Sequence, residues 1–132
     1  MKTFLMLFLL LFSLDTMAQQ VRDASGRLQG TWQNDQYRDA SGRQQYRVDN
    51  SGNVRDASGR NKLRVQGDDF RDASGRMVGR INQSGEVRDA SGRILGRISD
   101  DGQVRDASGR IMGRAPGSDK HRAAVNFFFW DE

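Results

Sequence analysis

The sequence predicts an all-β fold built from tandem β-hairpin repeats of about 17 residues each. The string Arg-Asp-Ala-Ser-Gly-Arg occurs six times, at intervals of 16 or 17 residues. The copies begin at Arg22, Arg38, Arg55, Arg71, Arg88 and Arg105. Between them apolar and charged residues alternate, which is the period of a strand buried on one face. Such repeats indicate small units that bury their apolar sides against one another.

Residues 1–18 are predicted to be a secretory signal peptide. Lys2 precedes an apolar run over residues 4–14, and the small-residue signature Thr16-Met17-Ala18 follows it. The run is shorter than the ~20 residues of a membrane-spanning helix, so we expect no transmembrane segment after cleavage. We therefore expect a secreted or periplasmic bacterial protein. The chain contains no cysteine, so disulfides do not stabilise it.

Each repeat has the chemistry of a tight hairpin. In Asp89-Ala90-Ser91-Gly92, the aspartate starts a type I turn and the glycine takes a positive φ. A three-residue loop of this kind places Asp89 opposite Arg93 and Val87 opposite Leu95. Residues 19–116 are thus predicted to form a six-copy hairpin domain, arranged as a flower or as a meander.

A second turn signal separates consecutive repeats. It occurs at residues 49–52, 66–68, 82–85 and 99–102. The same pairing rule places Ile81 opposite Val87 and Ile98 opposite Val104.

Two columns of apolar residues are predicted to form the core. The first contains Val21, Tyr37, Val54, Phe70, Val87 and Val104, and the second contains Trp32, Val48, Val65, Ile81, Ile98 and Ala115. Leu95 and Ile98 both pair with inward valines although they are three residues apart, so Gly96 between them indicates a bend or bulge. Tyr46 and Leu63 replace this glycine in the second and third units, which should be straighter.

Residues 117–132 depart from the repeat. They contain the aromatic run Phe127, Phe128, Phe129 and Trp130, which would favour aggregation if exposed. We expect this segment to dock on the repeat domain as a closing strand or a core plug. The alternative is an exposed tail that docks a partner protein. No window outside residues 1–18 shows a helical period.

The repeats resemble those of the bacterial 4-fold beta-flower family. The similarity lies in units such as residues 87–98 and 104–115, and in the tail from Ala123 to Trp130. This resemblance implies hairpin petals around an axis and implies no activity or functional residue. A second, weaker resemblance is to the tyrosine-aspartate repeats of large secreted shells, on residues 37–43.

The residues do not predict an enzyme. His121 is the single histidine and lies in a polar stretch, and with no cysteine a zinc site lacks ligands. The aspartates and serines recur in six equivalent turns, and their turn role accounts for them. We expect no catalytic residue, metal or cofactor.

Arginine is the residue type whose pattern points to binding. Pairing sets Arg80 beside Arg88 and Arg97 beside Arg105 on the outer face, where like charges destabilise a hairpin. This ladder is a candidate site for an anionic glycan, lipopolysaccharide or envelope surface. The alternative is a solubilising face. Nucleic acid is a less suitable partner, since few aromatic residues are available to stack on bases. We predict a non-catalytic structural or binding module at the cell envelope.

Overall fold

The protein folds into a closed ring of antiparallel strands. The structure is a computed structural model that describes residues 19–117 and 119–130, so the predicted signal peptide lies outside it. Within these residues each strand pairs with its sequence neighbours, and the last strand pairs with the first. The strands are β1 (Gln19–Asp23), β2 (Leu28–Gln33), β3 (Gln36–Asp39), β4 (Gln44–Val48), β5 (Asn53–Asp56), β6 (Asn61–Gln66), β7 (Asp69–Asp72), β8 (Met77–Ile81), β9 (Glu86–Asp89), β10 (Ile94–Ile98), β11 (Gln103–Asp106) and β12 (Ile111–Arg114).

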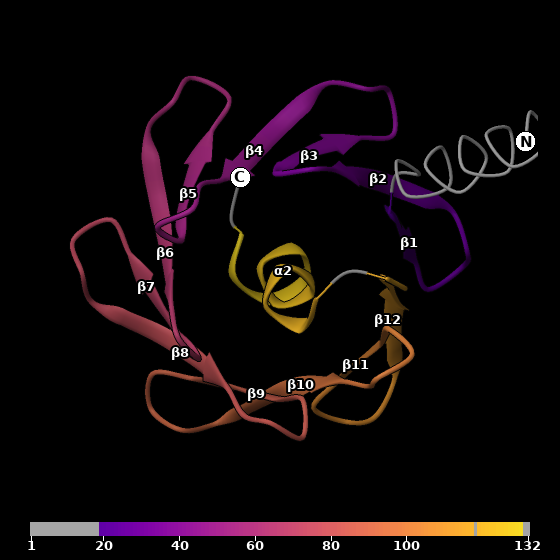
Figure 1. Ribbon diagram of the computed structural model, residues 1–132. Coiled ribbons are helices and arrows are strands. Elements are labelled where there is room, and N and C mark those ends of the chain that lie inside the picture. The colour runs from indigo at the N-terminus through magenta and orange to yellow at the C-terminus, as the bar shows by residue number, and fades with distance from the viewer. Residues whose placement is uncertain (1–18, 118, 131–132) are drawn as a thin grey trace, which may run out of the picture.

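Figure 1 shows the strands as hairpin petals that radiate from a central helical tail. The described strands make six petals, from β1–β2 to β11–β12. The predicted all-β hairpin class is confirmed, and the ring closes.

The turn at each petal tip is held by its aspartate. In the fifth petal Asp89 Oδ1 accepts from the Ser91 N–H at 3.0 Å, the Ser91 hydroxyl at 2.8 Å and the Arg93 N–H at 3.0 Å. The Asp89 N–H donates to the Arg93 carbonyl at 2.9 Å, and Gly92 has a φ of 92°. The predicted loop is confirmed here, and its backbone bonds recur in all six petals.

These turns make stability depend on pH. The hydroxyl of the adjacent serine and backbone N–H groups hold the pKa of each of the six motif aspartates below the ordinary 3.8. Because the folded pKa is lowered, the stabilisation is complete above pH 3.8 and is lost as the pH falls through the folded values. We therefore expect the Tm, measured by circular dichroism, to fall steeply only below about pH 4.

Asparagine provides the control for this pH dependence. In the turn between β8 and β9, Asn82 Oδ1 accepts from the Ser84 N–H at 3.1 Å and the Glu86 N–H at 2.9 Å, so an amide can form the same turn. A chain with Asp→Asn in all six motif turns should lose less Tm between pH 5 and pH 2 than the wild type. An equal loss in both proteins would contradict this origin of the acid sensitivity.

A β-bulge follows every petal-tip turn. In the fifth petal Arg88 pairs with Ile94 and Val87 pairs with Gly96, so Leu95 is an extra residue. The predicted pairing of Val87 with Leu95 is therefore wrong by one position. The bulge brings Gly96 and Ile98 onto the same inward face. It is therefore Gly96, and not Leu95, that faces inward together with Ile98, as strand alternation requires.

The same register shift occurs in all six petals. The expectation that the second and third petals are straighter is wrong, because the bulge belongs to the shared turn and not to the inward glycine. The extra residues, called bulge positions below, are Gln29, Gln45, Lys62, Val78, Leu95 and Met112.

Neighbouring petals meet at seams, where the even strand of one pairs with the odd strand of the next. The predicted pairs Ile81–Val87 and Ile98–Val104 are confirmed. The connecting turns also bond to one another across a petal: the Ile98 N–H donates to the Gly85 carbonyl at 2.8 Å. This interlocks the turns at one end of the ring.

The two predicted apolar columns line the inside of the ring. The first column is buried throughout, and the second is buried or packs against the core. The predicted core is thereby confirmed.

The tail forms a helix, which was not predicted. It consists of α2 (Lys120–Ala124), capped by Asp119, and the wider π-helical turn η1 (Val125–Phe129). A closing strand does not form, because the closed sheet leaves no free edge in its centre. A helix satisfies its own backbone groups there.

Three consecutive basic residues attach α2 to the ring. Each reaches the acidic residue of a different connecting turn, and these turns belong to every second seam. Successive residues of an α-helix are rotated by about 100° around its axis, which is close to the angle between alternate seams of a six-petal ring. The pairs are Lys120–Asp100 at 2.6 Å, His121–Asp68 at 3.1 Å and Arg122–Asp35 at 3.1 Å.

Candidate functional site

The outer wall carries pairs of arginines at five of the six seams. The two predicted pairs, Arg80–Arg88 and Arg97–Arg105, lie directly opposite each other as expected. Three further pairs, which the sequence reasoning missed, repeat the arrangement; the remaining seam pairs Thr31 with Arg38. The ten residues, called the arginine belt below, are Arg22–Arg114, Arg47–Arg55, Arg64–Arg71, Arg80–Arg88 and Arg97–Arg105.

The two members of each belt pair have different tasks. The member that starts the repeat motif donates from Nη1 to the turn glycine carbonyl at 2.7–3.1 Å, as Arg88 does to Gly92. Arg88 also pairs with Glu86 at 2.8 Å. These arginines therefore hold the turns.

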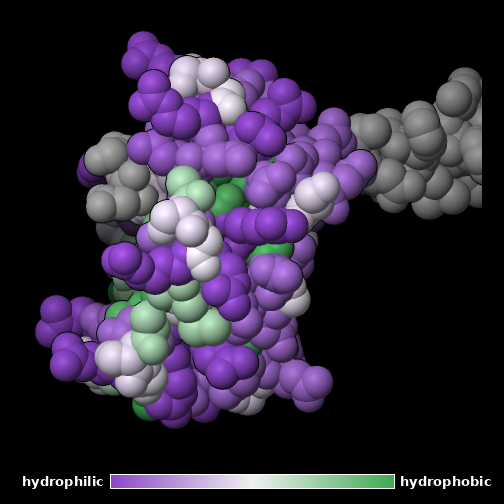
Figure 2. Space-filling view, turned by 90° about the vertical axis from the view of Figure 1, so that its left-hand side faces the viewer, coloured by the Kyte–Doolittle hydropathy of each residue, from purple (hydrophilic) through white to green (hydrophobic). Residues whose placement is uncertain are grey.

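The second members are exposed on the even strands. Arg80 pairs with Asp69 at 3.4 Å. The other four make no hydrogen bond or ion pair within the described residues; they are Arg47, Arg64, Arg97 and Arg114. Figure 2 shows one side of the ring, where hydrophilic side chains predominate and hydrophobic ones form a small strip. The second members of the belt pairs thus present guanidinium groups that are exposed to solvent.

The aromatic tail lies inside the ring, against three inward glycines. Phe127, Phe128 and Phe129 cover Gly113, Gly96 and Gly79, in the sixth, fifth and fourth petals respectively. A Cβ at Gly96 would lie 2.6 Å from Phe128 Cζ, so only glycine leaves room for the ring. Three consecutive residues thus face three consecutive petals. Because a π-helical turn holds more residues than an α-helical one, its smaller rotation per residue suits adjacent petals.

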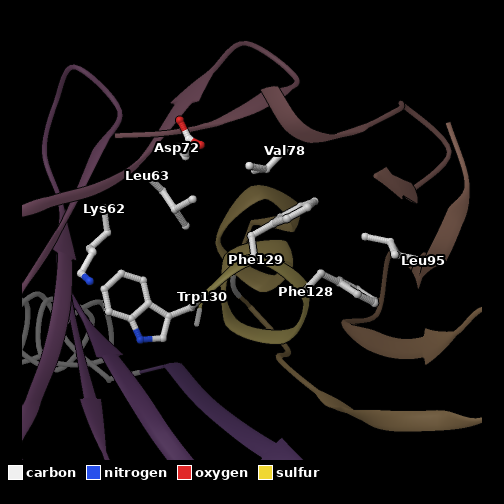
Figure 3. A pocket seen from close by; sticks show the side chains of 8 residues that line it. All are labelled: Lys62, Leu63, Asp72, Val78, Leu95, Phe128, Phe129 and Trp130. Atoms are coloured by element: carbon white, nitrogen blue, oxygen red, sulfur yellow. The ribbon is translucent and has the colours of Figure 1, made fainter. Parts of the chain in front are cut away.

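Trp130 breaks this succession. It packs on Tyr46 of the second petal, with ring centroids 4.2 Å apart, and not on the third petal that would come next. Two pockets flank its indole. The first, called the apolar pocket, has a volume of about 590 Å³ and contains Phe128, Phe129 and Trp130 in its wall (Figure 3). Its other lining residues are Lys62, Leu63, Asp72, Val78 and Leu95.

The second pocket, called the polar pocket, lies between Trp130 and the first two petals. It has a volume of about 420 Å³. Aromatic rings and polar side chains share its lining, which consists of Gln29, Tyr37, Asp39, Gln45, Tyr46, Asn126 and Trp130.

Bulge positions contribute to the lining of both pockets. They are polar in the first three petals and apolar in the last three. Gln29 and Gln45 line the polar pocket, whereas Lys62, Val78 and Leu95 line the apolar one. Aligning the six copies reveals this change in the sequence, but its meaning depends on knowing that the bulge positions face the tail.

His121, the only histidine of the chain, contacts Asp68 and lies beside Phe70 at a centroid distance of 6.1 Å. Within residues 19–117 and 119–130, no three His, Asp or Glu side chains come together to hold a metal ion. In the same part of the chain no helix has the length and apolar character to cross a membrane.

A family model described as "5-fold beta-flower protein" matches residues 18–131. The chain belongs to the 5-fold beta-flower protein family. The predicted resemblance to beta-flower proteins is correct, but the predicted family was the 4-fold one and the matching family is the 5-fold one. No curated protein and no solved structure matches the chain.

This beta-flower protein has six petals in its described residues, so its copy number differs from the five in the family's description. Membership of a repeat family of this kind indicates a non-catalytic repeat protein.

Proposed function

We propose that this beta-flower protein is a secreted, non-catalytic binding module of a bacterial cell envelope, and that it binds anionic glycans along the arginine belt. The observation that carries the proposal is the arginine pair at five of six seams. Like charges placed opposite each other destabilise a sheet. Guanidinium groups bind phosphate, sulfate and carboxylate in a forked geometry, so an anionic ligand would offset that repulsion.

A polymer suits this arrangement better than a small anion. The pairs recur once per petal, so a chain with regularly spaced charges can contact several of them at once. Nucleic acid suits it less well, because every aromatic residue that the structure describes lies in the core or in the tail packed against it. Secretion and an envelope location rest on the predicted signal peptide.

The proposal is tested by binding of residues 19–132, which hold the whole described ring, to lipopolysaccharide and to neutral dextran. We expect saturable binding to lipopolysaccharide at low salt, which weakens near 0.15 M salt, and no binding to dextran. A belt variant carries Arg47→Gln, Arg64→Gln, Arg97→Gln and Arg114→Gln. At about 0.4 kcal/mol for each exposed charge, its affinity should fall about tenfold.

The matched control removes the same number of charges from the petal tips. It carries Arg43→Gln, Arg60→Gln, Arg76→Gln and Arg93→Gln, whose backbone N–H groups hold the turns and whose side chains are exposed. Its affinity should change much less than that of the belt variant. An equal loss of affinity in the two variants would show that only the net charge matters. If the wild type did not bind lipopolysaccharide at all, the belt would be a solubilising face.

A further inference from the structure

The polar pocket is where two irregularities of the sequence meet. One is the stretch Gln44-Gln45-Tyr46, which differs from the other repeats, and the other is the end of the aromatic tail. Gln45, Tyr46 and Trp130 all line this pocket. Six copies of one hairpin make equivalent surfaces, so a place where the copies differ can bind a ligand that the others cannot.

Two side-chain donors of residues that line the polar pocket have no hydrogen-bond partner among the described residues. Trp130 Nε1 is buried and unpaired. In Figure 3 this nitrogen is turned away from Asp72 and Val78, which lie across the apolar pocket. The Tyr37 hydroxyl makes no hydrogen bond to another described residue either, and burial raises its pKa to about 12, so it stays protonated. Trp130 Nε1 has almost no accessible surface, so the Tyr37 hydroxyl is the donor of this pair that a ligand in the pocket can reach. A ligand with an acceptor oxygen would satisfy that hydroxyl.

Other polar groups around the pocket are already positioned by the fold. Asn126 Oδ1 accepts from Trp32 Nε1 at 2.9 Å, and its Nδ2 donates to the Tyr46 hydroxyl. Gln45 Nε2 donates to Asp39 Oδ2 at 2.9 Å. Packing and hydrogen bonds therefore orient the lining before a ligand arrives, which lowers the cost of binding.

The lining excludes several ligand classes. It contains no lysine or arginine, so an anionic group would find no counter-charge. Its single charged residue, Asp39, already has Oδ1 in the petal-tip turn and Oδ2 bonded to Gln45, so a cation is also disfavoured. No aliphatic side chain lines it, and four of its seven lining residues are amides or a carboxylate, which suit a lipid chain poorly. Aromatic rings, amides and a hydroxyl remain.

These groups match a ligand that has one apolar ring face and a rim of hydroxyls that both donate and accept. We infer that the polar pocket binds one neutral sugar unit, whose ring stacks on Trp130 and whose hydroxyls bond to Tyr37, Gln29 and Gln45. The volume of about 420 Å³ is that of a small-molecule site. This site is separate from the arginine belt and does not depend on it.

The test follows the Trp130 indole N–H signal in ¹H–¹⁵N NMR spectra of residues 19–132. The probes are glucose, galactose, mannose and N-acetylglucosamine, each added separately. The backbone N–H of Gly109 is bonded to the Asp106 carbonyl in the turn of the sixth petal, neither residue lines the pocket, and its amide signal serves as the internal reference. We expect at least one sugar to shift the Trp130 signal saturably and to shift the Gly109 signal little. The absence of a saturable shift for all four sugars, or equal shifts of both signals, would overturn the inference.

Three variants test the assigned contacts. Tyr37→Phe and Trp130→Phe each remove one unpaired donor and keep an aromatic ring, and Gln45→Ala removes one amide. Each should weaken sugar binding about fivefold. Gln83→Ala, in the exposed turn between β8 and β9, is the matched control and should bind as the wild type does. Binding in Tyr37→Phe and Gln45→Ala is followed by the Trp130 signal, and in Trp130→Phe by backbone amide shifts of β3 and β4.

Separate results can contradict the proposal for the polar pocket and the proposal for the arginine belt. Sugar binding should persist in the belt variant and be insensitive to salt, because the lining has no unpaired charge. Lipopolysaccharide binding should in turn survive Tyr37→Phe. Loss of sugar binding in the belt variant would show that the pocket is not an independent site.

Discussion

Removal of residues 120–132 is expected to abolish the cooperative unfolding of this beta-flower protein. The ring closes around the tail, and without it the inward glycines would face a void. The buried residues Ala123, Ala124 and Val125 would be lost together with the aromatic rings and the contacts of Lys120, His121 and Arg122 with the connecting turns. A Phe→Ala substitution in a core costs about 3–5 kcal/mol. Losing three partly buried rings at once therefore approaches the whole stability of a small domain, about 5–15 kcal/mol.

The measurement is thermal and urea unfolding of residues 19–119 against residues 19–132, followed by circular dichroism. A control with Phe→Leu at positions 127–129 retains apolar volume and should unfold cooperatively at a lower Tm. If the truncated chain instead unfolded with the Tm of the longer one, the tail would be an accessory that is free to dock a partner protein.

Gly85→Ala is expected to destabilise the protein far more than Gly92→Ala. Both glycines have a left-handed φ, of 90° and 92°, so alanine is strained at either position by about 1–2 kcal/mol. The difference lies in what surrounds them. A Cβ at Gly85 would overlap the carbonyl oxygen of Ile98 at the end of β10, whereas a Cβ at Gly92 meets no atom within 4 Å.

The overlap at Gly85 involves backbone and cannot be relieved by a side-chain rotation. It should raise the total cost to about 2–5 kcal/mol, because the bond between the Gly85 carbonyl and the Ile98 N–H must shift as well. Urea unfolding of the two single variants measures the difference. Gly52→Ala, which would meet the Val65 carbonyl in the same way, repeats the test at another seam. If Gly85→Ala and Gly92→Ala lowered the free energy of unfolding by similar amounts, the connecting turns would not be interlocked in solution.

Much of the binding surface could be predicted, because it repeats with the fold. The pairs Arg80–Arg88 and Arg97–Arg105 follow from the seam register, and the register follows from glycine turns with no ambiguity of loop length. Applying the same rule to the other seams would have found the three remaining pairs. The role of the motif arginine, whose guanidinium group bonds to the turn glycine, needed three-dimensional coordinates.

The polar pocket could not be predicted in this way. Its residues come from the first two petals and from the tail, which are more than 70 residues apart in the sequence. The packing of Trp130 on Tyr46 depends on how far the tail has rotated when it reaches the second petal. That rotation follows from the change from α2 to η1, for which no sequence pattern was recognised.

The sequence by itself determined the hairpins, their turns and the apolar columns of this beta-flower protein. These features depend on local chemistry: an aspartate that bonds its own turn, a glycine at positive φ, and alternation along a strand. Tertiary structure decided the register after each petal-tip turn, the closure of the ring and the helical form of the tail. Gly96 indicated a bend or bulge, but the sequence did not show which residue the bulge adds, and a tail surrounded by a sheet with no free edge must satisfy its backbone by itself.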